Sequence, residues 1–228
     1  MRCQIRARDR DLRTQSFRDQ LVTMSDPTAL FAAIESHDLG RLGELLAGGC
    51  DPGALKLTPP GWSALHEAIE QLEDGGPLEA LVLLLRAGAH ADSNGGDTPL
   101  LMALYRSQPQ AVYLLLAGGA DPNVRGPEGD SPLRVCAERG DTQMAETLLR
   151  CGARATLDEP GGPAGASALG IAAMRLDLPM LTLLLRWGAD PNARDTDRQL
   201  ARDRLAPRTS ENAAARDAAE RLLGAANR

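Results

Sequence analysis

Hydrophobic and polar positions follow a two-part pattern that returns five times along this chain. The first part opens with Thr or Ser and continues with small and apolar residues, and the second part is a leucine-rich run that ends at a glycine. The first parts start at Thr28, Ser63, Thr98, Ser131 and Ser167, so their spacings are 35, 35, 33 and 36 residues. A period of this length indicates a solenoid, in which each unit buries its apolar face against its neighbours.

Each unit is predicted to form two helices followed by a loop. The Thr or Ser at its start is well placed to cap the first helix, and proline follows directly at Pro99 and Pro132, where a missing N–H costs nothing. A glycine after the leucine run suits the left-handed residue that ends a second helix. These glycines are Gly49, Gly88, Gly119, Gly152 and Gly188. The extended residues after each glycine should lead into a hairpin-like finger.

Both parts of the unit resemble the ankyrin repeat, whose pattern is TPLHxAA followed by VxxLLxxGADxN. The chain reads SALHEAI, TPLLMAL and SPLRVCA in the first part, and LLAGGADPN and LLRWGADPN in the second. The resemblance covers roughly residues 27–192. It implies an all-α solenoid of five helix-turn-helix repeats with hairpin-like fingers over residues 25–197. Residues 198–228 would then form a degenerate sixth repeat that caps the C-terminal end with a polar outer face.

Residues 1–24 stand apart as an Arg-rich N-terminal extension, with Leu12, Phe17, Leu21 and Val22 as its apolar positions. Three interpretations remain open: a frayed or docked helix, a disordered segment, or a stretch that precedes a true translation start at Met24. The extension has no continuous apolar core and does not read as an ordinary secretory signal. Nowhere does an apolar stretch approach the roughly 18 residues that span a membrane.

Charge and composition narrow the possible partners. The chain carries a net charge of −6, which argues against general nucleic-acid binding. Residues 1–24 hold six Arg and three Asp, so the extension is +3 and the remainder is −9. Lys56 is the one lysine among 25 basic residues, a bias that indicates a GC-rich bacterial genome. Aromatic residues make up only 3% of the chain, which suits short helices packed through Leu and Ala.

The sequence contains no complete catalytic or metal-binding motif. His66 and Glu67 begin an HExxH-like run, but Glu70 stands where a zinc site needs its second histidine. His66 is better explained as the repeat's own histidine, which satisfies backbone groups near the finger. The cysteines form no CxxC pair, and Cys50 and Cys136 are expected to be buried small hydrophobic residues in a reduced, cytoplasmic setting. We therefore expect no enzyme activity, no cofactor and no metal.

The resemblance implies a concave binding face built from the fingers and the exposed side of each first helix. Equivalent positions place an apolar strip across the third to fifth units, a ladder of three arginines beside it, and two glutamates at the N-terminal end. An aromatic residue on the long first finger is a further candidate. The predicted protein-binding residues are Trp62, Glu67, Glu70, Met102, Tyr105, Arg106, Val135, Arg139, Ile171, Met174 and Arg175.

The sequence thus predicts a non-catalytic protein-interaction module, a monomeric scaffold or adaptor that binds an unidentified protein partner. Two alternatives remain. The acidic body would suit an immunity or antitoxin protein that neutralises a basic enzyme through electrostatic steering. An effector delivered into another cell, with residues 1–24 as its address, is the other.

Overall fold

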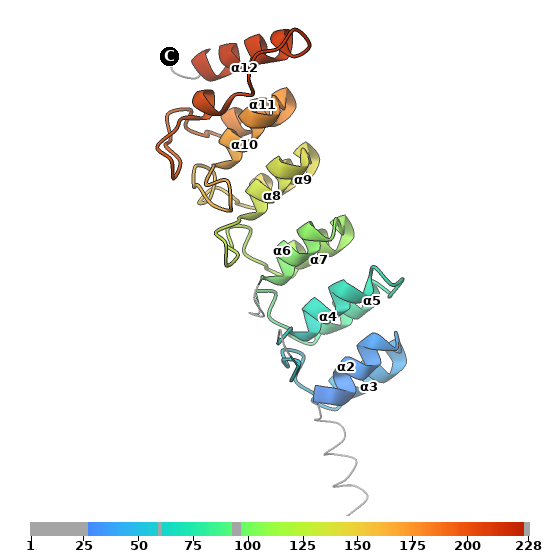
Figure 1. Cartoon of the computed structure of the whole chain (residues 1–228). Helices are drawn as coiled ribbons and strands as arrows, with labels where there is room; N and C mark the ends of the chain where they lie inside the picture. Colours follow the sequence, from blue (N-terminus) through green and yellow to red (C-terminus); the bar gives the residue numbers. More distant parts are fainter. Residues whose placement is uncertain (1–26, 59–60, 93–96, 226–228) are drawn as a thin grey trace, which may run out of the picture. The chain divides into compact units, whose positions relative to one another are not determined.

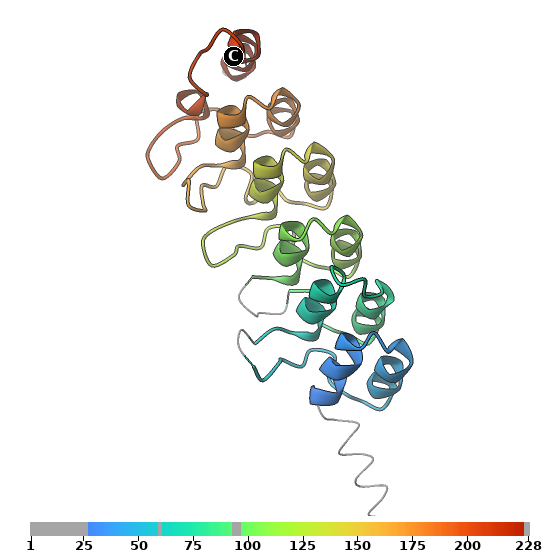
Figure 2. The same ribbon diagram turned by 45° about the vertical axis from the view of Figure 1, so that its right-hand side comes forward.

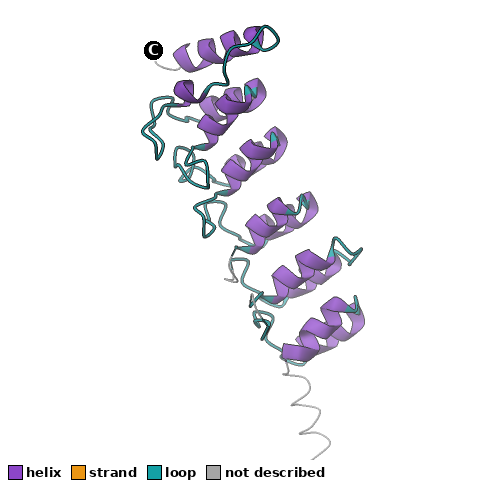
Figure 3. Cartoon of the chain, viewed as in Figure 1, coloured by secondary structure: helices purple, strands orange, loops and turns teal. Residues whose placement is uncertain are grey.

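The computed structural model describes residues 27–58, 61–92 and 97–225 (Figure 1). The N-terminal extension, residues 1–24, lies outside these ranges. The chain divides into two compact units, one ending at Gly95 and the other beginning at Gly96. The described parts of both units are made of helices joined by loops (Figure 3). This agrees with the all-α prediction.

The first unit contains two helix pairs. These are α2 (Pro27–Glu35) with α3 (Leu39–Ala47), and α4 (Ala64–Gln71) with α5 (Glu79–Arg86). First helix packs on first helix and second on second, because α2 contacts α4 and α3 contacts α5. Leucines and small residues from all four helices form the core, including the fully buried Leu45, Leu65 and Leu84.

The second unit continues the same arrangement with three helix pairs and a terminal helix. The elements are α6 (Pro99–Tyr105), α7 (Pro109–Ala117), α8 (Pro132–Arg139), α9 (Thr142–Arg150), α10 (Ala168–Arg175), α11 (Leu178–Arg186), the short 3-10 helix η1 (Ala201–Arg204) and α12 (Ala213–Ala225). Here α6 packs on α8, α8 on α10, and α9 on α11. Helix α12 covers α11 and buries Ala219 and Leu223.

The predicted caps form at α6, α8 and α10. The cap predicted at Thr28 is wrong, because Thr28 lies inside α2 (Pro27–Glu35) and does not precede it. The hydroxyls of Thr98 and Ser131 accept hydrogen bonds from backbone N–H groups three residues later, each at 3.4 Å, and Ser167 accepts one at 3.2 Å. At α4 the backbone N–H of Ser63 donates to Nδ1 of His66 at 3.2 Å. The structural role expected for His66 is therefore confirmed.

The second helices end as the sequence predicts. All five glycines after the leucine runs have φ between 90° and 102°, the left-handed region that glycine enters without steric cost. After Gly119 and Gly152 the chain leaves the helix pair in a long finger and returns to the next first helix (Figure 2). Two described fingers are closed by isolated bridges, between Leu55 and Ser63 and between Gly161 and Ala166.

Neighbouring fingers of the second unit are joined by hydrogen bonds about one repeat apart. The side chain of Asn123 donates to the carbonyl of Gly152 at 3.0 Å and accepts from the N–H of Ala155 at 2.9 Å. One repeat later, Asp158 accepts from the N–H of Asp190 at 2.8 Å. These contacts fix each finger to the next, so the unit presents its fingers in register.

Candidate interaction surface

Three side chains of the predicted apolar strip are buried. Met102, Val135 and Ile171 are 7%, 1% and 5% exposed, so the expectation that they project from the surface is wrong. They lie on α6, α8 and α10, and α8 packs against both of the other helices. An apolar residue at this position is held between adjacent first helices, where it stabilises the stack and is not available to a partner.

The next predicted positions are more accessible. Met174 is 41% exposed and Arg175 is also exposed, both on the last turn of α10. Tyr105 and Arg106, at the end of α6, are half-buried. The accessible part of the predicted face therefore lies at the C-terminal ends of the first helices.

The three predicted binding residues of the first unit, Trp62, Glu67 and Glu70, differ in how deeply they are buried. Glu67 is 3% exposed and accepts from Nζ of Lys56 at 2.8 Å and from Nε2 of Gln71 at 3.0 Å. Because it is buried, Glu67 cannot present its charge to a partner at the surface. Glu70 is half-buried. Trp62 is also half-buried, and its carbonyl accepts from the N–H of Lys56 at 2.7 Å, which places it near the base of the finger.

Arg139 is exposed, but its side chain also makes hydrogen bonds that stabilise the fold. Its guanidinium donates to the backbone carbonyl of Tyr105 at 2.5 Å and to the hydroxyl of Ser107. A cation at a helix C-terminus is favourable because the last carbonyls carry partial negative charge. The expected ladder of free arginines is thus incomplete, since Arg139 links α8 to the end of α6.

Tyr105 belongs to a chain of polar contacts that joins two repeats. Its hydroxyl donates to Oδ2 of Asp130 at 3.0 Å, and the other oxygen of Asp130 accepts from Nη1 of Arg134 at 3.0 Å. Nη2 of Arg134 donates to Oε1 of Glu138 at 2.7 Å. Burial, and then the negative charge of Asp130, raise the pKa of Tyr105 well above its usual value. The phenol therefore stays a neutral donor.

Arg134 is completely buried and occupies the position that His66 holds in the second repeat. Its charge is compensated by Asp130 and Glu138, whose side chains are 13% and 43% exposed. A bare Cβ at Gly162 would fall 2.7 Å from Nη2 of Arg134. The buried guanidinium thus lies beneath the next finger, which can close over it because a glycine stands there.

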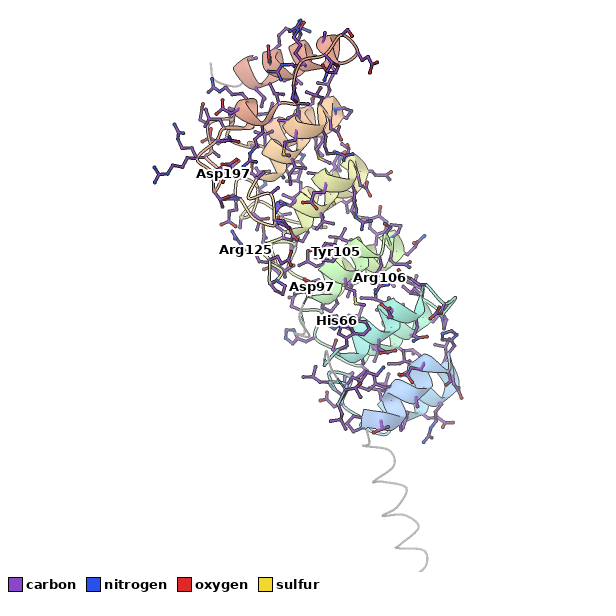
Figure 4. The ribbon with its side chains drawn as sticks, viewed as in Figure 1. His66, Asp97, Tyr105, Arg106, Arg125 and Asp197 are labelled. Atoms are coloured by element: carbon purple, nitrogen blue, oxygen red, sulfur yellow. The ribbon has the colours of Figure 1, made fainter. Side chains whose placement is uncertain are left out.

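A pocket of about 390 Å³ opens beside Tyr105 and is lined by Asp97, Tyr105, Pro127, Glu128 and Asp130. Asp97 precedes α6, and the last three residues come from the finger between α7 and α8. Figure 4 labels Tyr105 and Asp97 on this side of the unit. Three carboxyl groups and a tyrosine at one opening can accept hydrogen bonds from a cationic side chain and contact its methylene groups.

Sequence reasoning missed these carboxylates. A signal was present, because GD stands directly before the Thr or Ser of two successive repeats, at Asp97-Thr98 and Asp130-Ser131. Asp130, which precedes α8, accepts from Tyr105 at the end of α6, the first helix of the preceding repeat. Asp97, which precedes α6, lines the same pocket.

The helix pairs stack on one another, each second helix ends at a glycine in the left-handed region, and neighbouring fingers are held in register. These features define a class of helical repeat proteins in which the loops and the first helices form the accessible surface. Two matches to the family model for ankyrin repeats (3 copies) cover residues 30–126 and 100–195, which is more than half of the chain. The chain belongs to the ankyrin repeat family. Repeats of this family mediate binding to protein partners and are typically not catalytic.

Curated relatives share only part of the chain. The mouse B-cell lymphoma 3 protein homolog is 36% identical over 100 residues, covering 42% of this chain and 21% of that protein. Human NF-kappa-B inhibitor alpha is 33% identical over 94 residues, covering 40% of this chain and 30% of that protein. The matched part thus spans less than a third of either relative.

Solved structures share the fold over most of the chain. An ankyrin repeat domain from Acinetobacter baumannii has a TM-score of 0.73 and 24% identity, and the match covers 89% of this chain and 99% of that one. The human ASB11 ankyrin repeat domain has a TM-score of 0.65 and 23% identity, with 85% and 81% covered.

Within the residues that the structure describes, no group of three or more His, Cys, Asp or Glu side chains is arranged to hold a metal ion. Cys50 and Cys136 are buried, as predicted, and burial raises the pKa of the Cys136 thiol, which suppresses thiolate chemistry. Over residues 27–58, 61–92 and 97–225, no helix has both the length and the apolar character needed to cross a bilayer.

Proposed function

We propose that this chain is a non-catalytic protein-binding module, a scaffold or adaptor, and that its second unit binds the partner at the pocket beside Tyr105. The observation that carries the proposal is the grouping of Asp97, Glu128 and Asp130 around a half-buried tyrosine at the mouth of a finger. Tyrosine supplies rigid contact area, and the carboxylates select positive charge. The partner therefore presents an Arg or Lys side chain to this pocket.

The fingers support this proposal because they are held in place before binding. The side chains of Asn123 and Asp158 join successive fingers by hydrogen bonds to backbone groups, and Gly161 and Gly162 lie against the finger that carries Glu128. A surface that is already ordered loses little conformational entropy when a partner binds. Met174 and Arg175, exposed on α10, extend the same unit's accessible surface for further contacts.

The test is capture of partners from a lysate of the native cells with four forms of the chain. Glu128→Lys reverses an exposed charge at the pocket, and Glu211→Lys makes the same change at an exposed position before α12. Arg175→Glu tests the arginine ladder without touching Arg139, which supports α6. We expect one dominant protein to be retained by wild type and Glu211→Lys and lost from Glu128→Lys.

Equal capture by Glu128→Lys and wild type would overturn the placement of the site at this pocket. Loss from Arg175→Glu alone would move the contact to the end of α10. Binding measured at two salt concentrations adds a check, because charge pairing at an exposed pocket weakens as salt rises.

A second candidate function is supported by the same acidity. Outside residues 1–24 the chain carries −9, and an inhibitor of a basic enzyme would use such a charge to attract its target. The captured partner distinguishes the two functions. An enzyme whose activity falls when one equivalent of the chain is added indicates an immunity or antitoxin role, and a partner whose activity is unchanged indicates a scaffold.

A further inference from the structure

An apolar groove lies in the first unit, between α2 and the finger that follows α3. Its volume is about 310 Å³, and its walls include Pro27, Phe31 and Ala32 of α2 and Leu55 and Leu57 of the finger. Leu55 is 51% exposed and Leu57 is 88% exposed. Large apolar side chains left this accessible on one finger indicate a surface that another segment covers.

We propose that the N-terminal extension, residues 1–24, docks in this groove and covers Leu55 and Leu57. The first argument is connection. Only two residues separate the extension from Pro27, which is itself part of the groove wall. A short tether keeps the extension at an effective concentration on the order of millimolar, so even weak contacts are occupied.

Charge is the second argument. Residues 27–95 contain ten acidic and three basic residues, a net charge of −7, whereas the extension carries +3. At the groove itself, Glu35 and Lys56 both line the wall and pair with each other at 2.7 Å, so the charge that attracts the extension comes from the unit as a whole. The sign of the extension is therefore opposite to that of the unit to which it is joined, and docking is favoured along its length.

Apolar pattern is the third argument. Phe17 and Leu21 are four residues apart, the spacing that places two side chains on one face of a helix, and Val22 follows directly. These residues are separated from Pro27 by few enough positions to reach the finger. Covering two leucines is favourable, and ordering the segment offsets most of that gain, so we expect a docking equilibrium constant on the order of 10.

The extension's arginines allow a direct test by limited digestion of the full chain with trypsin. Docking protects the bonds after Arg13 and Arg18, and the rates of these cleavages are followed by mass spectrometry. Leu57→Asp puts a charge on the groove at a side chain too exposed to affect folding, and Leu57→Met keeps the groove apolar. We expect cleavage to be about 5–10 times faster in Leu57→Asp and unchanged in Leu57→Met.

A paired variant in the extension separates docking from other effects. Phe17→Ser with Leu21→Ser should give the same acceleration, and adding Leu57→Asp to it should give no more, since both changes break one interaction. Equal cleavage rates in wild type and Leu57→Asp would overturn the proposal. Acceleration that appears only at concentrations where the chain dimerises would also overturn it, because a second copy would then be the occupant.

Discussion

Asp130 links the third repeat to the fourth and compensates a buried positive charge. One of its oxygens accepts from Tyr105 and the other from the buried Arg134. A buried guanidinium is tolerated only while its charge is compensated, and the partner on its other side, Glu138, is 43% exposed, so solvent screens its charge. Asp130 therefore provides most of the compensation.

Replacing Asp130→Asn should lower the free energy of unfolding by about 2 kcal/mol or more, because Arg134 loses its buried counter-charge. Urea denaturation of wild type and variant measures the difference. Asp217→Asn is the matched control, since Asp217 pairs with Arg208 on the surface and an exposed pair contributes little. A loss as small as that of the control would show that Glu138 alone satisfies Arg134.

Tyr105 gives the chain a predictable response to alkaline pH. Its pKa is raised in the folded state, so the stability that this group contributes is fully present below the unfolded value, near pH 10, and is lost as the pH rises further. We expect the stability difference between wild type and Tyr105→Phe to be constant from about pH 8 to about pH 9.5 and to shrink toward about pH 11. Urea denaturation at those pH values measures it, and a constant difference throughout would contradict the assignment.

At the scale of elements, the sequence predicts helices better than it predicts surfaces. The start and end of each helix pair depend on local chemistry, a hydroxyl cap and a left-handed glycine, and these can be identified in one repeat at a time. Whether Met102 or Val135 is exposed depends on how closely successive first helices approach, which no single repeat encodes. The site was missed for the same reason, because Asp130 meets Tyr105 across 25 residues of chain.

The finger between α9 and α10 can pack closely against the preceding finger because residue 161 is a glycine. A Cβ at Gly161 would lie 2.8 Å from the carbonyl carbon of Gly129 and would overlap its oxygen. The N–H of Gly162 donates to the carbonyl of Glu128 at 3.0 Å, so the two fingers meet through their backbones. Any side chain at position 161 must push them apart.

Gly161→Ala should therefore cost about 2 kcal/mol of unfolding free energy through overpacking and the loss of that hydrogen bond. Gly224→Ala is the matched change in α12, where nothing lies within 4 Å of the added Cβ and alanine favours the helix. Thermal unfolding of both variants gives the comparison. Equal melting temperatures would mean that the fingers move apart freely, and the argument for a preformed binding surface would lose its support.

At the scale of the whole molecule, a repeat array need not lose its structure all at once. Each repeat contacts its neighbours, and stability is close to a sum of local terms. The C-terminal end of the second unit illustrates this, because α12 and η1 contact α10 and α11 and leave α6 and α8 to their own neighbours. The side chain that best fixes α12 is Leu223, which is 3% exposed.

Leu223→Ala should remove about 2–3 kcal/mol of stability by leaving a cavity under α12, and the loss should stay local. We expect hydrogen exchange to become faster in α12 and in the end of α11, with no change in α8. Leu222→Ala, next to it and half-exposed, controls for the change in helix composition and should alter the exchange far less. Acceleration that reaches α8 would instead mean that the second unit unfolds as one cooperative block, so that the terminal helix stabilises the pocket beside Tyr105 from three repeats away.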